Sequence, residues 1–109
     1  VNIDITDQLI VIKSKQSKNF QLMGAYPNPF NPTTQIKYNL PEDSFVSIKI
    51  YDVMGRNIRS LMNVNQTAGY HSVRWDAKND IGEGVAAGMY IYTIQAGEFR
   101  ATKKMVLLK

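Results

Sequence analysis

Short runs of alternating apolar and polar residues recur along most of this chain, and turn residues separate them. The runs occupy residues 36–40, 46–51, 56–64, 70–75, 88–96 and 99–108. A period of two places one face of a strand on a core and the other face in solvent. No useful length of sequence shows the spacing of an amphipathic helix. The pattern therefore predicts an all-β fold, an antiparallel sandwich of about seven strands.

The sharpest local signal is Gly97-Glu98, which lies between the last two runs. A two-residue loop with Gly first is typical of a type II′ hairpin turn. That turn sets the register, so that Ala96 pairs with Phe99 and Tyr90 with Met105. We expect Tyr90, Tyr92, Ile94, Phe99 and Met105 to share the inner face, with Lys103 opposite Tyr92 and its charge at the edge.

A proline-rich stretch, "YPNPFNP" at 26–32, precedes the first clear strand. Each proline fixes φ, lacks an N–H and favours extended geometry in the residue before it, so the stretch is neither a helix nor a central strand. We expect a stiff entrance to the domain, with Tyr26 and Phe30 available to dock on the core and the asparagine side chains holding turns. A docking epitope is the alternative function of this stretch.

Composition limits the possible functions. The chain has 109 residues, enough for one domain and one modest core, and no apolar run approaches the ~20 residues of a membrane helix. Residues 1–7 do not have the pattern of a signal peptide, and we expect the chain to be a piece of a larger protein. Without cysteine it has no disulfide, thiolate zinc site or thiol nucleophile.

The net charge of +4 gathers at the two ends of the chain, without the interleaved aromatics of a nucleic-acid groove. We therefore expect no nucleic-acid partner and no membrane insertion.

No catalytic arrangement is apparent. His71 is the only histidine, no Ser or Cys is spaced to be its nucleophile, and the carboxylates lie mainly in turns. We expect no enzymatic activity and no cofactor. The loop at 76–84 offers hard oxygen ligands suited to calcium, but without the ordered spacing of a dedicated calcium loop, and Asx turns explain the same composition. These weak metal candidates are Asp76, Asn79, Asp80 and Glu83.

Several stretches together resemble a known family. They are "YPNPFNPTTQIKY", "LP", "VSIKIYDVMGR", "AGYHSVRWDAKNDIGEGVAAGMYIY" and "KKMVLLK", in that order over residues 20–109. The chain resembles the type A C-terminal sorting domains of the bacterial type IX (Por) secretion system. It is also similar to the immunoglobulin-like domain of the flagellar hook-capping protein. The resemblance implies an immunoglobulin-like sandwich at 20–109, preceded at 1–19 by the end of an upstream region and a basic linker.

The resemblance also implies a function. Such a domain directs a secreted cargo, folded in the periplasm, through the outer-membrane translocon. A surface sortase then removes the domain and attaches the cargo to the cell surface. The expected partners are therefore the translocon, the sortase and the upstream cargo domain. The expected cleavage region comprises Lys13, Ser14, Lys15, Gln16, Ser17, Lys18 and Asn19. The expected translocon-recognition residues are Lys103, Lys104, Met105, Val106, Leu107, Leu108 and Lys109.

Two other functions fit the same residues. Trp75 with the tyrosines could form a sugar-stacking platform, which would make the domain a carbohydrate-binding module of an extracellular protein. Core packing is the competing role of these rings, because large aromatic side chains bury the most area. The domain could also be a structural spacer that assembles with its neighbours.

Overall fold

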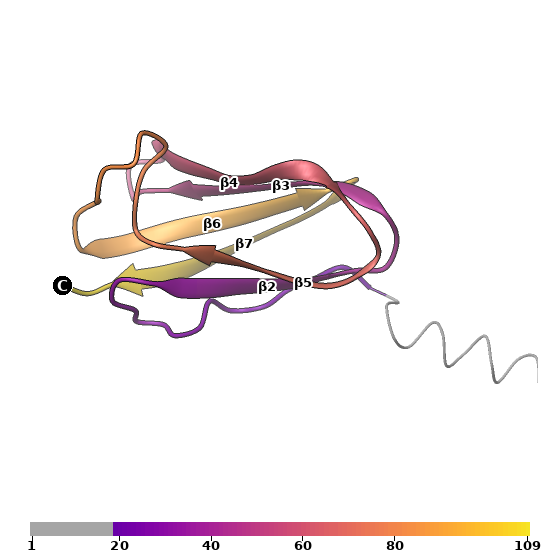
Figure 1. Ribbon diagram of the computed structural model, residues 1–109, viewed down its shortest axis with the longest axis horizontal. Helices are drawn as coiled ribbons and strands as arrows, with labels where there is room; N and C mark the ends of the chain where they lie inside the picture. Colours follow the sequence, from indigo (N-terminus) through magenta and orange to yellow (C-terminus); the bar gives the residue numbers. More distant parts are fainter. Residues whose placement is uncertain (1–18) are drawn as a thin grey trace, which may run out of the picture.

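The computed structural model describes residues 19–109, and they form two antiparallel β-sheets packed face to face (Figure 1). One sheet has the order β1-β2-β5 and the other β4-β3-β6-β7. The strands are β1 (Gln21–Leu22), β2 (Thr34–Leu40), β3 (Ser44–Tyr51), β4 (Asn57–Gln66), β5 (Gly69–Trp75), β6 (Gly88–Ala96) and β7 (Phe99–Leu107). The prediction of an all-β sandwich of about seven strands is confirmed. Within 19–109 there is no helix that could span a membrane.

The core follows the alternation seen in the sequence. In β3, Val46, Ile48 and Ile50 are fully buried, while the residues between them face outward. The inner faces of the other strands complete the cluster. Its largest fully buried side chains are Trp75, Tyr38, Tyr92, Phe30, Ile36, Leu40, Ile48, Ile50, Ile94, Met105, Leu107 and Val46.

The hairpin between β6 and β7 has the predicted register without interruption, from Gly88 opposite Leu107 to Ala96 opposite Phe99. Gly97 has φ of +60°, whereas φ of Glu98 is not positive. A type I′ turn requires positive φ at both loop positions, so the turn is type II′. Tyr90, Tyr92 and Met105 are buried as expected, and Phe99 is half-buried because it lies at the rim and stacks on Phe20 at 5.0 Å.

Strand β4 is the irregular one. Its register against β3 shifts twice, so that Leu61 and Ile58 are each the extra residue of a bulge. Both side chains nevertheless pack against the core cluster. A bulge adds one residue to a strand and changes the direction of its side chains, which is how anchors three positions apart can both reach the core.

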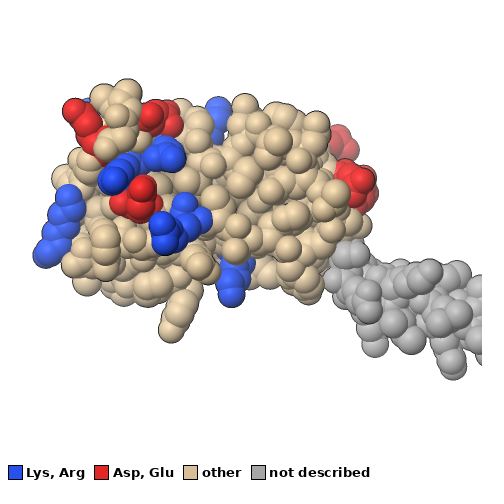
Figure 2. Space-filling model, viewed as in Figure 1, with Lys and Arg blue, Asp and Glu red and all other residues tan. Residues whose placement is uncertain are grey.

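Charge is unevenly distributed over the sandwich. On the face seen in Figure 2, most Lys, Arg, Asp and Glu atoms gather at the end that holds the β3–β4 turn, and the middle is largely uncharged. Asp52 shapes that turn by accepting the N–H groups of Met54 and Arg56, and its carboxylate pairs with the Arg56 side chain at 2.8 Å. No basic stripe runs along the described residues of this face.

Two methionines provide a matched test of the core. Met105 is fully buried and Met54 is 77% exposed in a turn. Met105→Ala should lower the free energy of unfolding by about 2–5 kcal/mol, because it leaves a cavity beside the central rings, and Met54→Ala should change it by less than about 0.5 kcal/mol. Urea denaturation followed by Trp75 fluorescence measures both. Equal effects of the two substitutions would contradict the burial of the inner face of β7.

Candidate functional site: the terminal strand and the segment that covers its edge

The predicted recognition residues all lie on β7 or directly after it, but they do not share one surface. Met105 and Leu107 are fully buried, whereas Lys103 and Lys104 are exposed. Val106 is half-buried, and Leu108 and Lys109 are exposed beyond the end of the strand. A partner can therefore contact only part of this set, and the rest holds the strand in the core.

Strand β7 is the edge of its sheet, since it pairs with β6 on one side only. Backbone groups along an antiparallel strand point alternately toward and away from the neighbouring strand. A two-residue hairpin loop makes Ala96 and Phe99 a hydrogen-bonded pair, so the odd-numbered residues of β7 bond to β6. The N–H and C=O groups of residues 100, 102, 104 and 106 consequently point to the open edge.

The proline-rich segment covers the second half of that edge. The Phe30 N–H donates to the Val106 carbonyl at 2.9 Å, and the Leu108 N–H donates to the Phe30 carbonyl at 2.8 Å. The Asn28 side chain accepts the Val106 N–H through Oδ1 at 2.9 Å and donates to the Lys104 carbonyl through Nδ2 at 3.3 Å. The segment thus acts as a short substitute for a neighbouring strand. The expectation that the asparagines hold local turns is wrong for Asn28, which bonds to β7 instead.

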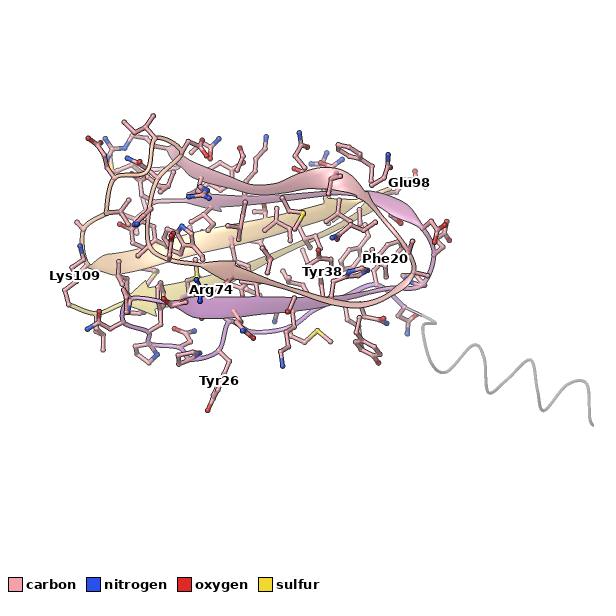
Figure 3. The ribbon with its side chains drawn as sticks, viewed as in Figure 1. Phe20, Tyr26, Tyr38, Arg74, Glu98 and Lys109 are labelled. Carbon is pink, nitrogen blue, oxygen red and sulfur yellow. The ribbon has the colours of Figure 1, made fainter. Side chains whose placement is uncertain are left out.

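Core contacts fix the segment in place. Phe30 is only 2% exposed and packs on Trp75, with ring centroids 5.7 Å apart. The Thr34 hydroxyl donates to the Pro27 carbonyl at 2.7 Å. Tyr26 does not dock on the core, contrary to expectation: it is 80% exposed and projects from the ribbon (Figure 3). The bridge between Tyr26 and Gln35 aligns the backbone and leaves the ring in solvent.

Tyr92 joins the start of the described chain to β6. Its ring is fully buried, and its hydroxyl accepts the Ala25 N–H at 2.7 Å and donates to the Met23 carbonyl at 3.0 Å. Burial raises the pKa of the Tyr92 hydroxyl, and the Ala25 N–H opposes that shift because it favours the phenolate. One phenol therefore positions the backbone that leads directly into the proline-rich segment.

Of the predicted cleavage region, Lys13, Ser14, Lys15, Gln16, Ser17 and Lys18 lie outside the described residues. Asn19 is described: it is exposed, and its carbonyl accepts a hydrogen bond from the Asn39 side chain at 3.1 Å. Phe20 then packs on Phe99 beside the β6–β7 turn. The chain enters the sandwich at this end, and Lys109 lies at the opposite end (Figure 3).

Two of the four weak metal candidates, Asn79 and Asp80, have side-chain partners within the protein. The Asn79 side-chain oxygen accepts the N–H groups of Ile81 and Glu83, and the Asp80 carboxylate accepts the Ser60 N–H at 2.9 Å. Among residues 19–109, no three His, Cys, Asp or Glu side chains are grouped as a metal site. These bonds give Asn79 and Asp80 structural roles in holding the loop.

Trp75, the central residue of the possible sugar platform, belongs to the core together with Tyr90 and Tyr92. Trp75 is fully buried, its indole N–H donates to the Lys78 carbonyl at 2.9 Å, and it meets Tyr90 edge-on at 5.3 Å. The proposed sugar platform is therefore wrong for Trp75, because the ring has no face in solvent. His71 stacks on Tyr38 at 5.4 Å, and its Nε2 lies 2.7 Å from the Thr67 carbonyl. Its surroundings are those of a structural histidine.

Comparison with known proteins decides the family. The family model for the secretion system C-terminal sorting domain matches residues 24–108. The chain belongs to this family. The match begins just before the proline-rich segment and extends past β7, so it contains both parts of the covered edge. The domain sorts the protein that carries it, through the type IX system, to the cell surface or the extracellular space. Among curated proteins, none matches the sequence.

Solved structures share the fold of this sorting domain. The dimeric latent PorU from Porphyromonas gingivalis superposes with a TM-score of 0.65 and 20% identity, over 83% of this chain and 9% of PorU. PorZ, a surface component of the type IX secretion system of the same bacterium, superposes with a TM-score of 0.54 and 19% identity, over 89% of this chain and 12% of PorZ. This chain thus spans only a small part of either protein. FlgD from Xanthomonas campestris, a hook-capping protein, superposes with a TM-score of 0.56 and 20% identity, over 89% of this chain and 72% of FlgD.

The role of Asn28 can be tested against its neighbour Asn31, which is also exposed. Asn28→Ala should lower the free energy of unfolding by about 0.5–1.5 kcal/mol, because two hydrogen bonds to β7 are lost at a partly solvated edge. It should also speed hydrogen exchange at the Val106 amide. Asn31→Ala should do neither. Slow exchange at Val106 in the Asn28 variant would show that the side chain does not cover this edge.

Tyr92→Phe should lower the free energy of unfolding by about 1–3 kcal/mol at neutral pH, because the buried Ala25 N–H loses its acceptor. The difference should narrow above about pH 10, where tyrosine ionises in the unfolded chain. Because the pKa of Tyr92 is raised in the folded protein, its hydroxyl contributes fully to the free energy of unfolding below that pH. The contribution is lost as the pH rises through the pKa of Tyr92 in the folded protein. Urea midpoints at several pH values measure this, with the exposed Tyr70→Phe as control. A stability difference between the parent protein and Tyr92→Phe that widens as the pH rises would contradict this prediction.

Proposed function

We propose that this sorting domain performs no catalysis and acts by presenting the exposed part of β7 and the residues after it to the type IX translocon. The residues available for contact are Lys103, Lys104, Leu108 and Lys109, all exposed. The buried members of the predicted set, Met105 and Leu107, would act indirectly by holding the strand in place. The observation that carries the proposal is the family match, which extends over the whole of β7.

The positions of the two ends support a division of labour between partners. The described chain enters the sandwich beside Phe20, and Lys109 lies at the far end (Figure 3). A translocon bound along the edge of β7 would leave the linker that precedes Phe20 accessible. We propose that a surface sortase cuts within 13–19, that 1–19 are the end of the cargo region and its linker, and that 20–109 are the sorting domain. The stacking of Phe20 on Phe99 supports a boundary at residue 20.

The test must keep the domain folded. Deletion of residues 103–109 would also remove Met105 and Leu107 from the core, so loss of export by that truncation would be ambiguous. Charge substitutions avoid this difficulty. The full chain, fused after a fluorescent cargo in a bacterium with a type IX system, should carry the cargo to the surface. Lys103→Gln with Lys104→Gln and Lys109→Gln should reduce surface fluorescence by about tenfold or more, as for loss of ~1.4 kcal/mol of recognition.

The matched control is Lys37→Gln with Arg74→Gln and Lys78→Gln, which removes the same charge from exposed positions outside β7 and its groove. It should be exported like the parent fusion. Equal export of both triple variants would refute recognition through the terminal lysines. Retention of the parent fusion in the periplasm would refute the sorting function of this chain in that system.

A further inference from the structure

The first half of the β7 edge is open. The outward backbone groups of Lys104 and Val106 that face Phe30 and Asn28 are bonded, and this coverage stops at the Lys104 carbonyl. The outward N–H and C=O groups of Arg100 and Thr102, and the Lys104 N–H, have no strand beside them within residues 19–109. A sheet edge of this kind is a template for an added strand.

The other sheet edges are less suited to pairing. Strand β4 is interrupted by two bulges, and β1 has only two residues. Strand β5 is a second regular edge, but it is shorter than β7, and Arg74 is its single Lys or Arg, so it lacks the basic charge of β7. Strand β7 has nine residues in continuous register with β6, without a bulge. Bulges and short strands are common ways to prevent edge pairing, and β7 has neither.

The side chains of this edge are positively charged. Arg100, Lys103 and Lys104 are exposed, and β7 contains no carboxylate. On the outer face, a shallow groove of about 240 Å³ adjoins Arg100 and Thr102 and also carries Lys49, without any acidic lining residue. Edge lysines disfavour pairing with neutral or basic strands, whereas opposite charges across a strand pair are favourable.

A second copy of this chain is a poor occupant. Antiparallel pairing of two β7 strands about a twofold axis at Thr102 would place Arg100 of each copy opposite Lys104 of the other. Like charges directly opposite one another destabilise a strand pair. The edge is therefore better matched to a different chain whose charge is negative.

Resting on the proposed function, we propose that an extended acidic segment of the secretion machinery adds as a fifth strand beside Arg100–Lys104. Main-chain hydrogen bonds at residues 100, 102 and 104 supply the pairing, and Arg100, Lys103 and Lys104 select the acidic side chains. This main-chain contact lies earlier on β7 than residues 105–109, where the Asn28–Phe30 segment already occupies the edge, and it is additional to the side-chain contacts proposed for Leu108 and Lys109.

One variant separates backbone pairing from side-chain contact. Thr102→Pro removes an N–H that points away from β6, and proline is tolerated at such edge positions. Thr102→Ala removes the side chain but keeps the N–H. In the export assay with the full-chain fusion, Thr102→Pro should lower surface delivery by about tenfold or more, and Thr102→Ala by less than about twofold. Equal delivery of the two would overturn strand addition. Failure of the unmodified fusion would instead count against the sorting function.

A binding measurement on the unmodified domain does not depend on whether the proline variant folds. The probe is a synthetic peptide that alternates Glu with Thr and Val and is blocked at both ends, and the control peptide has Lys in place of Glu. Amide resonances of Arg100, Thr102 and Lys104 should shift with the acidic peptide, and their hydrogen exchange should slow by about tenfold or more. Shifts confined to other residues, no slowing, or an equal response to the lysine peptide would each overturn the proposal.

Discussion

The hydroxyl of Tyr92 joins the start of the described chain to β6, and the placement of the candidate site depends on it. Its ring is part of the core, while its oxygen bonds to the backbone of Ala25 and Met23. The chain from that point leads to Asn28 and Phe30, which pair with β7. β6 therefore supports β7 twice: directly as its neighbouring strand, and indirectly by positioning the segment that covers the other side of β7.

Burial of side chains and coverage of the backbone divide β7 into two parts. Met105 and Leu107 anchor the strand, and the proline-rich segment pairs with the same stretch, so this part is fixed to the domain on both sides. Around Thr102 the strand has β6 on one side only. A sorting signal needs a rigid surface that remains available after the protein has folded. An edge strand held at its far end supplies such a surface without a pocket or a catalytic group.

The prolines contribute to this arrangement because of what they lack. Pro27, Pro29 and Pro32 have no N–H of their own, so the segment cannot itself offer a regular strand edge to another chain. It covers β7 through the two main-chain bonds of Phe30 and the side chain of Asn28. The edge of the sheet is therefore closed to a further strand over residues 104–108. The exposed ring of Tyr26 beside it has no role in this packing.

Local patterns determined the strands from β2 to β7, the type II′ turn at Gly97-Glu98 and the inward side of β6, since turn geometry and a period of two act between residues close in sequence. They did not predict the two-residue β1. The same patterns placed Phe30 in the core. They could not show that Asn28 bonds to Val106, because 78 residues separate the pair and an exposed asparagine in a proline-rich stretch usually holds a local turn. Nor could they separate the buried from the exposed residues among Lys103–Lys109 in relation to a partner, or rule out Trp75 as a sugar platform. Those features depend on how the two sheets pack and on which strand is left at the edge, and only the tertiary structure decides that.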